Sequence, residues 1–132
     1  MLPHSWRPAI VRPTQIYVLL WLAVISLAAN AEVVGGRAEV IDGDSIRING
    51  VEMRIHGIDA PESRQTCDLE GVVWDCGRDA TNALSEMLGN VTTRCTWSER
   101  DAYERLLATC FNNGKNINAN MVLDGMAIAY VY

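Results

Sequence analysis

The sequence predicts a small, mainly β domain with two helices, folded as a closed or partly closed five-stranded barrel. Short segments of alternating apolar and polar residues recur after residue 32, and an Asn49-Gly50 turn joins two of them. Only two segments carry apolar residues at helical spacing, one after the third strand and a short one before the last strand. An open α+β sheet with the same hairpins is the alternative architecture.

Residues 1–31 have the features of a cleaved signal peptide. Arg7 and Arg12 form a positive region, an apolar run covers residues 16–29, and residues 29–31 have the small-x-small pattern that precedes a cleavage site. We therefore expect a secreted or periplasmic protein whose domain covers the rest of the chain. An uncleaved N-terminal membrane anchor is the alternative, although the run is shorter than the roughly 20 apolar residues that span a bilayer.

Net charge argues against a simple nucleic-acid-binding module. The chain carries −5 at neutral pH, and loss of Arg7 and Arg12 with the leader lowers this to −7. Non-specific binding to a polyanion normally uses a basic surface. An acidic protein can still cut a polyanion when a divalent cation and a few arginines make its site locally positive.

We expect a monomer without a stable protein partner.

The first half of the predicted barrel consists of three strands. Residues 33–41 form the first, with Gly35-Gly36 as a kink or bulge, and residues 45–48 and 51–55 form a hairpin with a type I′ turn. Alternation places five apolar side chains on one face of this hairpin and the arginines on the other. The apolar set is Ile46, Ile48, Val51, Met53 and Ile55.

Four cysteines follow an export signal, which indicates two disulfides. Of the three possible connectivities we predict Cys67–Cys76, across a short loop without periodicity, and Cys95–Cys110, across two adjacent antiparallel strands. A zinc site is the rival interpretation, but the mature part has no C-x-x-C motif and a single histidine.

The second half of the chain supplies the helices and the remaining strands. A helix is predicted over residues 78–88, strands over 91–98 and 106–112, a short helix over 117–123 and a last strand over 127–132.

Carboxylates gather near the ends of the hairpin strands. Asp42, Asp44, Asp59 and Glu62 would repel one another unless a cation is present, and hard oxygen ligands favour Ca²⁺ or Mg²⁺. Arg54 lies between them in the sequence and can bind a phosphate with two hydrogen bonds. These residues predict a metal-dependent phosphodiesterase site, with Glu62 as the base. A solvated acidic loop is the alternative.

Arg105, after the polar loop 99–104, is the second arginine that we expect at this site. A surface arginine paired with Asp101 or Glu104 is the alternative interpretation.

An ordered set of motifs resembles the staphylococcal-type nuclease (thermonuclease) family over about residues 37–132. The set comprises Asp42-Gly43-Asp44-Ser45, Arg54, Asp59-Ala60-Pro61-Glu62, Tyr103-Glu104-Arg105 and Tyr130-Val131-Tyr132. The resemblance implies an OB-fold and Ca²⁺-dependent cleavage of DNA and RNA.

The resemblance also implies roles for individual residues. Asp44 and Asp59 would bind Ca²⁺ by their carboxylates and Ala60 by its backbone carbonyl, with Asp42 a more distant or alternative ligand. Glu62 would be the general base, and Arg54 and Arg105 would hold the phosphate. The nucleotide pocket would be lined by Tyr103, Tyr130 and Tyr132, for which packing at the barrel rim is the alternative.

Two departures from the family pattern bear on activity. Glu104 stands where the family usually has glycine, so that a carboxylate lies beside the phosphate-binding Arg105 and a side chain occupies a position that needs glycine's freedom. The family's C-terminal helix does not follow the tyrosines, so the predicted domain, residues 32–132, is C-terminally truncated. The competing prediction is therefore a catalytically silent OB module that binds nucleic acid or a partner, or an inactive truncated product.

Overall fold

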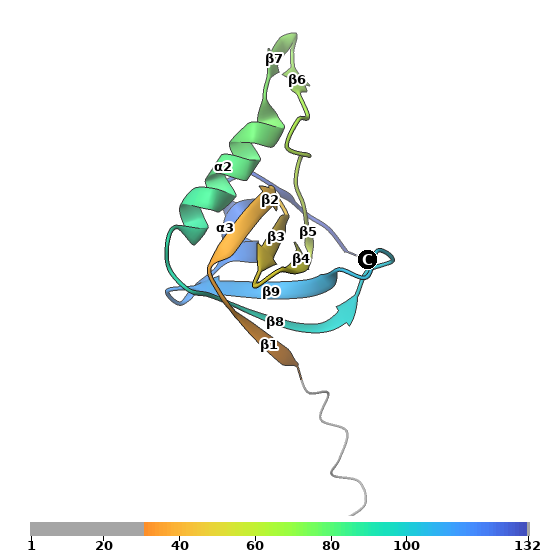
Figure 1. Ribbon diagram of the computed structural model, residues 1–132. Coiled ribbons are helices and arrows are strands. Elements are labelled where there is room, and N and C mark those ends of the chain that lie inside the picture. Colours follow the sequence, from red (N-terminus) through yellow and green to blue (C-terminus); the bar gives the residue numbers. More distant parts are fainter. Residues whose placement is uncertain (1–30, 132) are drawn as a thin grey trace, which may run out of the picture.

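The computed structural model describes residues 31–131 as one mainly β body with two helices (Figure 1). The predicted leader, but for its last residue, and Tyr132 lie outside the described residues. The strands of the main sheet are β1 (Glu32–Gly36), β2 (Ala38–Asp42), β3 (Ser45–Ile48), β4 (Val51–Ile55), β8 (Thr93–Arg100), β9 (Leu106–Asn112) and β10 (Lys115–Asn116). The other elements are β5 (Ile58–Asp59), β6 (Cys67–Leu69), β7 (Val72–Trp74), α2 (Cys76–Leu88), α3 (Ile117–Leu123) and β11 (Ile128–Ala129).

The main sheet is curled into a half barrel. Its strands follow the order β1-β8-β9-β4-β3-β2, with β10 added beside β9, and only the β4–β9 pair is parallel. The two ends of this path, β1 and β2, are consecutive in the chain and separated by Arg37 alone. The chain therefore links both edges of the sheet. Seen in Figure 1, α2 lies on the opposite side of the body from β1, β8 and β9.

The core lies between the curled sheet and the two helices. It contains Ile46, Ile48, Met53 and Ile55 from the β3–β4 hairpin, all fully buried, together with Leu84 and Leu88 of α2 and Met121 of α3. The predicted inward face of the hairpin is correct for these four residues and wrong for Val51, which is 40% exposed. Val51 directly follows the turn, and its cross-strand partner Ile48 is fully buried, so the exposure is confined to Val51 within this pair.

The Asn49-Gly50 turn is confirmed. Both residues have positive φ, 52° and 80°, which a type I′ turn requires. The turn sets the register in which Ile48 faces Val51 and Ser45 faces Arg54. This register carries Arg54 to the end of β4 nearest Asp44.

Several predicted boundaries differ from the structure. The predicted strand 33–41 is divided at Arg37, because its two halves pair with different partners, β8 and β3. The helix begins at Cys76 and not at residue 78, and the strand predicted over 91–98 is displaced to Thr93–Arg100. The predicted last strand, residues 127–132, shrinks to β11, which pairs with β5 outside the main sheet.

The segment between Cys67 and Cys76 was predicted as a loop, and it is a β-hairpin. Strands β6 and β7 pair antiparallel around Glu70-Gly71, both of which have positive φ. The hairpin projects away from the body at the N-terminal end of α2 (Figure 1). The predicted Cys67–Cys76 disulfide is present and ties its base to the helix.

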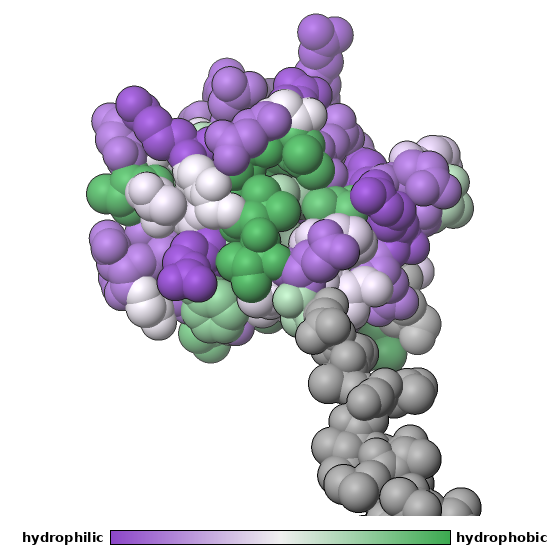
Figure 2. Space-filling model, turned by 60° about the horizontal axis from the view of Figure 1, so that its bottom comes forward, coloured by the Kyte–Doolittle hydropathy of each residue, from purple (hydrophilic) through white to green (hydrophobic). Residues whose placement is uncertain are grey.

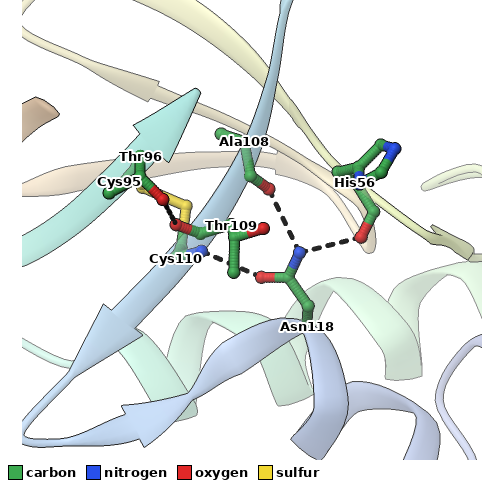
Figure 3. Close-up of a disulfide and its surroundings, with 7 residues drawn as sticks. All are labelled: His56, Cys95, Thr96, Ala108, Thr109, Cys110 and Asn118. Atoms are coloured by element: carbon green, nitrogen blue, oxygen red, sulfur yellow. Dashed lines mark hydrogen bonds between the residues drawn. A yellow bond between two sulfur atoms is a disulfide. The ribbon is translucent and has the colours of Figure 1, made fainter. Parts of the chain in front are cut away.

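The second predicted disulfide, Cys95–Cys110, is also present, and it lies in the core. The two residues face each other directly in the β8–β9 ladder, and both side chains are fully buried. Beside it, Asn118 of α3 accepts a hydrogen bond from the backbone N–H of Cys110 and donates to the carbonyl oxygens of His56 and Ala108 (Figure 3). This one buried amide therefore joins α3 to both β9 and the end of β4.

Within residues 31–131, the structure contains no helix with the length and apolar character needed to cross a membrane. The underside of the body combines a central group of hydrophobic residues with hydrophilic residues around it (Figure 2). Such mixing is normal, because a small domain has too little polar surface to cover itself.

Candidate active site

Arg54 joins two of the predicted site carboxylates. Its Nη1 lies 3.0 Å from Oδ1 of Asp44, and its Nη2 lies 2.8 Å from Oδ1 of Asp59. Asp44 reaches this position from the tight turn between β2 and β3, where its N–H donates to Oδ1 of Asp42. Asp59 ends the short strand β5. One guanidinium thus spans two carboxylates that are 15 residues apart in the sequence.

Asp44 is the buried member of this group, with a side chain only 5% exposed. Burial raises the pKa of its carboxyl above the usual value, while the backbone N–H of Ala60 and the Arg54 guanidinium act in the opposite direction. Its oxygens also accept hydrogen bonds from the Ser45 hydroxyl and, at 3.0 Å, from the Ala60 N–H. A further positive charge beside Asp44 would offset the cost of keeping the carboxylate ionised.

Glu62 and Asp59 are the solvent-facing carboxylates of the site. The side chain of Asp59 is half exposed and Glu62 is exposed. Glu62 lies in the loop after β5, where its carbonyl accepts a hydrogen bond from the N–H of Gln65 at 2.7 Å. Its carboxylate is therefore open to water, as a base that takes a proton from water must be.

The loop between β8 and β9 holds Arg105 through Asp101. Oδ2 of Asp101 accepts from Nε of Arg105 at 2.7 Å, and Oδ1 accepts from the backbone N–H groups of Tyr103 and Arg105. Burial alone would raise the pKa of Asp101, but the side-chain and backbone hydrogen bonds from Arg105 and that from Tyr103 outweigh it and lower the pKa. Asp101 therefore acts as the organising residue of this loop.

Glu104 adopts a left-handed backbone conformation, with φ of 65°. The sequence predicted a position that needs the conformational freedom of glycine, and this backbone angle confirms it. The loop is closed by the Glu104 N–H, which donates to the Asp101 carbonyl, and by the Glu104 carbonyl, which accepts from Arg100.

An open hollow of about 1200 Å³ brings the two arginine regions together. Its walls include six of the residues that the sequence predicted for the site: Arg54, Asp59, Glu62, Tyr103, Arg105 and Tyr130. Asp42, Asp44 and Ala60 are not among its lining residues. Asp44 is buried, with its carboxylate bonded to Arg54. Ala60 instead lines a smaller hollow of about 480 Å³ that shares Asp59 with the first.

A calcium site is the prediction that the geometry supports least directly. In the described part of the chain, no three His, Cys, Asp or Glu residues gather as a ready cluster of metal ligands. The donor chemistry nevertheless fits a hard cation, since carboxylate oxygens of Asp44 and Asp59 converge on one positive group and the donor atoms are all oxygens.

The loop-organising role of Asp101 was missed from the sequence, which gave it only as an ion-pair partner of Arg105. Its position four residues before Arg105, in the polar loop, is the available signal in the sequence. Aspartate commonly organises turns by accepting backbone hydrogen bonds.

Comparison with known proteins gives one positive result. A family model described as staphylococcal nuclease homologue matches residues 52–132, more than half of the chain. The matched region contains Arg54, Asp59, Glu62 and Arg105 and begins after Asp44. No curated protein sequence matches the chain significantly.

Proposed function

The chain belongs to the staphylococcal nuclease family, and from this premise we propose that it is a Ca²⁺-dependent nuclease that hydrolyses phosphodiester bonds of DNA, RNA or both. The observation that carries the proposal is that Arg54, Glu62 and Arg105 line one hollow. They come from a strand end and two different loops. A protein that only binds nucleic acid has no need of an exposed carboxylate in a hollow that also presents two arginines.

Each residue has a part in the proposed reaction. Arg54 and Arg105 bind the non-bridging phosphate oxygens and stabilise the charge that develops on them. Glu62 takes a proton from the attacking water. Asp44 and Asp59, with the Ala60 carbonyl, would hold the Ca²⁺, and Asp42 would support Asp44 through its bond to the Asp44 N–H. When bound, Ca²⁺ supplies positive charge to the phosphoryl group.

The tyrosines are proposed to contact the nucleotide. Tyr103 is 80% exposed and lies with its ring 5.5 Å from the guanidinium carbon of Arg105, and both residues line the hollow. Tyr130 lines the same hollow, and its N–H donates to the Gly57 carbonyl. Tyr132 is assigned the same role from the sequence pattern alone. A flat, exposed ring offers a stacking surface for a base.

A finer fold assignment accompanies this proposal. If β1 and β2 count as one bent strand, the sheet path closes through β3, β4, β9 and β8, which is a five-stranded barrel of the OB type. We also propose that the predicted signal peptide directs the protein to the periplasm or the exterior. Two disulfides fit an oxidising compartment.

A catalytically silent nucleic-acid-binding module is the second candidate. The observation that favours it is Glu104, a carboxylate on the wall of the hollow directly beside Arg105. Arg105 is also already engaged by Asp101, so that a phosphate must compete with two nearby carboxylates for it.

The deciding assay uses the full chain purified from an oxidising compartment. We expect cleavage of single-stranded DNA or RNA with Ca²⁺ and none with a chelator, and a fall in kcat of at least about 100-fold in Glu62→Gln. A protein that circular dichroism shows to be folded, but that binds an oligonucleotide without Ca²⁺-dependent cleavage, would be the silent module instead.

A further inference from the structure

The start of helix α2 is hydrogen-bonded to the turn that contains Glu62 and Gln65. The Glu62 N–H donates to the side-chain Oε1 of Gln65 at 3.1 Å, and the Gln65 N–H donates back to the Glu62 carbonyl at 2.7 Å. The carbonyl of Gln65 then accepts from the N–H of Gly77 at 3.0 Å, in the first turn of the helix. The first N–H groups of a helix lack partners within it, so this loop supplies one.

Gly77 is the point of closest approach between the helix and this loop. A Cβ at this position would overlap the carbonyl oxygen of Glu62 and lie 3.0 Å from the backbone nitrogen of Gln65. Alanine favours a helix over glycine by about 1 kcal/mol. Helix propensity does not explain why residue 77 is glycine. The backbone of Glu62 lies so close to this position that no side chain fits there.

The Cys67–Cys76 disulfide closes the same structure from the other side. Cys67 lies two residues after Gln65, and Cys76 immediately precedes Gly77. The bridge therefore attaches the segment that follows the Glu62 turn to the start of the helix. Cys76 is 7% exposed, and its partner at the base of the projecting hairpin is more accessible. The second disulfide lies in the core and has no part in this arrangement.

We propose that Gln65, Gly77 and the Cys67–Cys76 disulfide form a clamp that positions Glu62 for proton transfer. These are positioning residues that act through Glu62 and do not touch the substrate. The inference rests on the proposed function in that it takes Glu62 as the base. Proton transfer requires heavy atoms within hydrogen-bonding distance, and a displacement of about 1 Å can cost about 100-fold in rate.

The first test compares Gly77→Ala with Gly35→Ala in the oxidised full chain with Ca²⁺. A Cβ at Gly35 would have no contact closer than 3.8 Å, which makes that substitution a matched control. We expect kcat to fall by about 10- to 100-fold in Gly77→Ala with KM changed by less than about threefold, and neither to change in the control. Unchanged kcat in Gly77→Ala would overturn the proposal.

A double-mutant cycle separates positioning from general damage. If Gly77 acts only through Glu62, Gly77→Ala will have no further effect on the residual rate of Glu62→Gln. Losses that multiply in the double variant would show that Gly77 acts on something else, and would overturn the proposal.

A third measurement does not depend on activity. In Cys67→Ser/Cys76→Ser, which leaves Gly77 in place, we expect faster hydrogen exchange at the amides of Gln65 and Gly77 and unchanged exchange at the core Cys110 amide. Unchanged exchange at Gln65 and Gly77 would overturn the clamp even if the chain proves to have no nuclease activity. Absence of Ca²⁺-dependent cleavage by the unmodified chain would instead reject the proposed function.

Discussion

The two arginines that face the hollow are held in different ways. Arg54 is on a sheet strand, 16% exposed, and bonded to a buried carboxylate whose other oxygen is tied to a second backbone segment. Arg105 follows an exposed loop, and its partner Asp101 belongs to that same loop. Contacts between distant segments of the fold position Arg54. Arg105 is positioned by hydrogen bonds to Asp101, a residue only four positions before it in the same loop.

This difference predicts that the domain loses more stability when contacts of Arg54 are removed than when contacts of Arg105 are removed. Loss of a contact around Arg54 leaves a buried charge, and the entire domain is destabilised. Loss of a contact around Arg105 leaves Asp101, whose side chain is 11% exposed, in a surface loop that can open to water, which costs less stability while the orientation of the arginine is lost.

The largest effect is expected for Arg54→Ala. Asp44 would then remain buried without its guanidinium, so the free energy of unfolding should fall by about 3–5 kcal/mol, as measured by chemical denaturation. Under the proposed function, the folded fraction should cleave at least about 100-fold more slowly, because Arg54 is proposed to bind the phosphate.

Arg105→Ala is the matched variant for the other half of the site. We expect a similar loss of kcat and a loss of about 1 kcal/mol or less in stability. Equal destabilisation by the two variants would show that the two arginines are not held differently.

After Arg54→Ala, the largest loss of stability is expected on removal of the buried disulfide by Cys95→Ala/Cys110→Ala. The bridge closes a segment of sequence separation 15 between β8 and β9, and its loss should cost about 3 kcal/mol. Because the Arg105 loop connects these two strands, the rate of hydrogen exchange should rise more at the backbone amide of Arg105 than at that of Ile55 in β4. An equal rise at both amides would contradict the distinction.

Much of the arrangement around Arg54 could be predicted from the sequence because its signals are local. The Asn49-Gly50 turn fixes the register of β3 and β4, and that register brings Arg54 beside Asp44. The Cys95–Cys110 bridge followed from the adjacency of two strands. Both inferences needed only alternation, a turn and neighbouring positions in a hairpin.

What could not be predicted depends on contacts between distant segments. The β6–β7 hairpin has no alternating pattern, and Glu70 in its turn gives no sign of a left-handed backbone. The sequence likewise does not indicate that Gly77 lies against the carbonyl of Glu62, because that contact exists only after α2 has packed. The division of the first strand at Arg37 reflects two different pairing partners and not a local break.

The pH dependence of stability should report the Asp101 interaction. The folded state lowers the pKa of this carboxyl, so its contribution is fully present above the usual pKa of aspartate and is lost as the pH falls through the lower, folded value. Asp101→Asn should therefore be less stable than the parent by about 1 kcal/mol at neutral pH. The difference should shrink on acidification, as followed by denaturation at a series of pH values. A difference that grows on acidification would reverse the assigned sign.

The smallest effect, and one of opposite direction, is expected at Glu104. The residue has φ of 65°, which costs a non-glycine residue roughly 1–2 kcal/mol, and glycine would recover part of this after its larger loss of chain entropy. We expect Glu104→Gly to gain about 0.5–1 kcal/mol in stability, measured by chemical denaturation.

Glu104→Gln separates the backbone of this residue from its charge. Glutamine removes the carboxylate beside Arg105 but keeps the left-handed strain, so KM for an oligonucleotide should fall several-fold in both variants while stability rises only with glycine. The Coulomb energy of two charges about 4 Å apart is about 1 kcal/mol in water, which corresponds to such a change in affinity. If neither substitution improved binding, Glu104 would point away from the bound phosphate, and the main observation in favour of a silent module would lose its force.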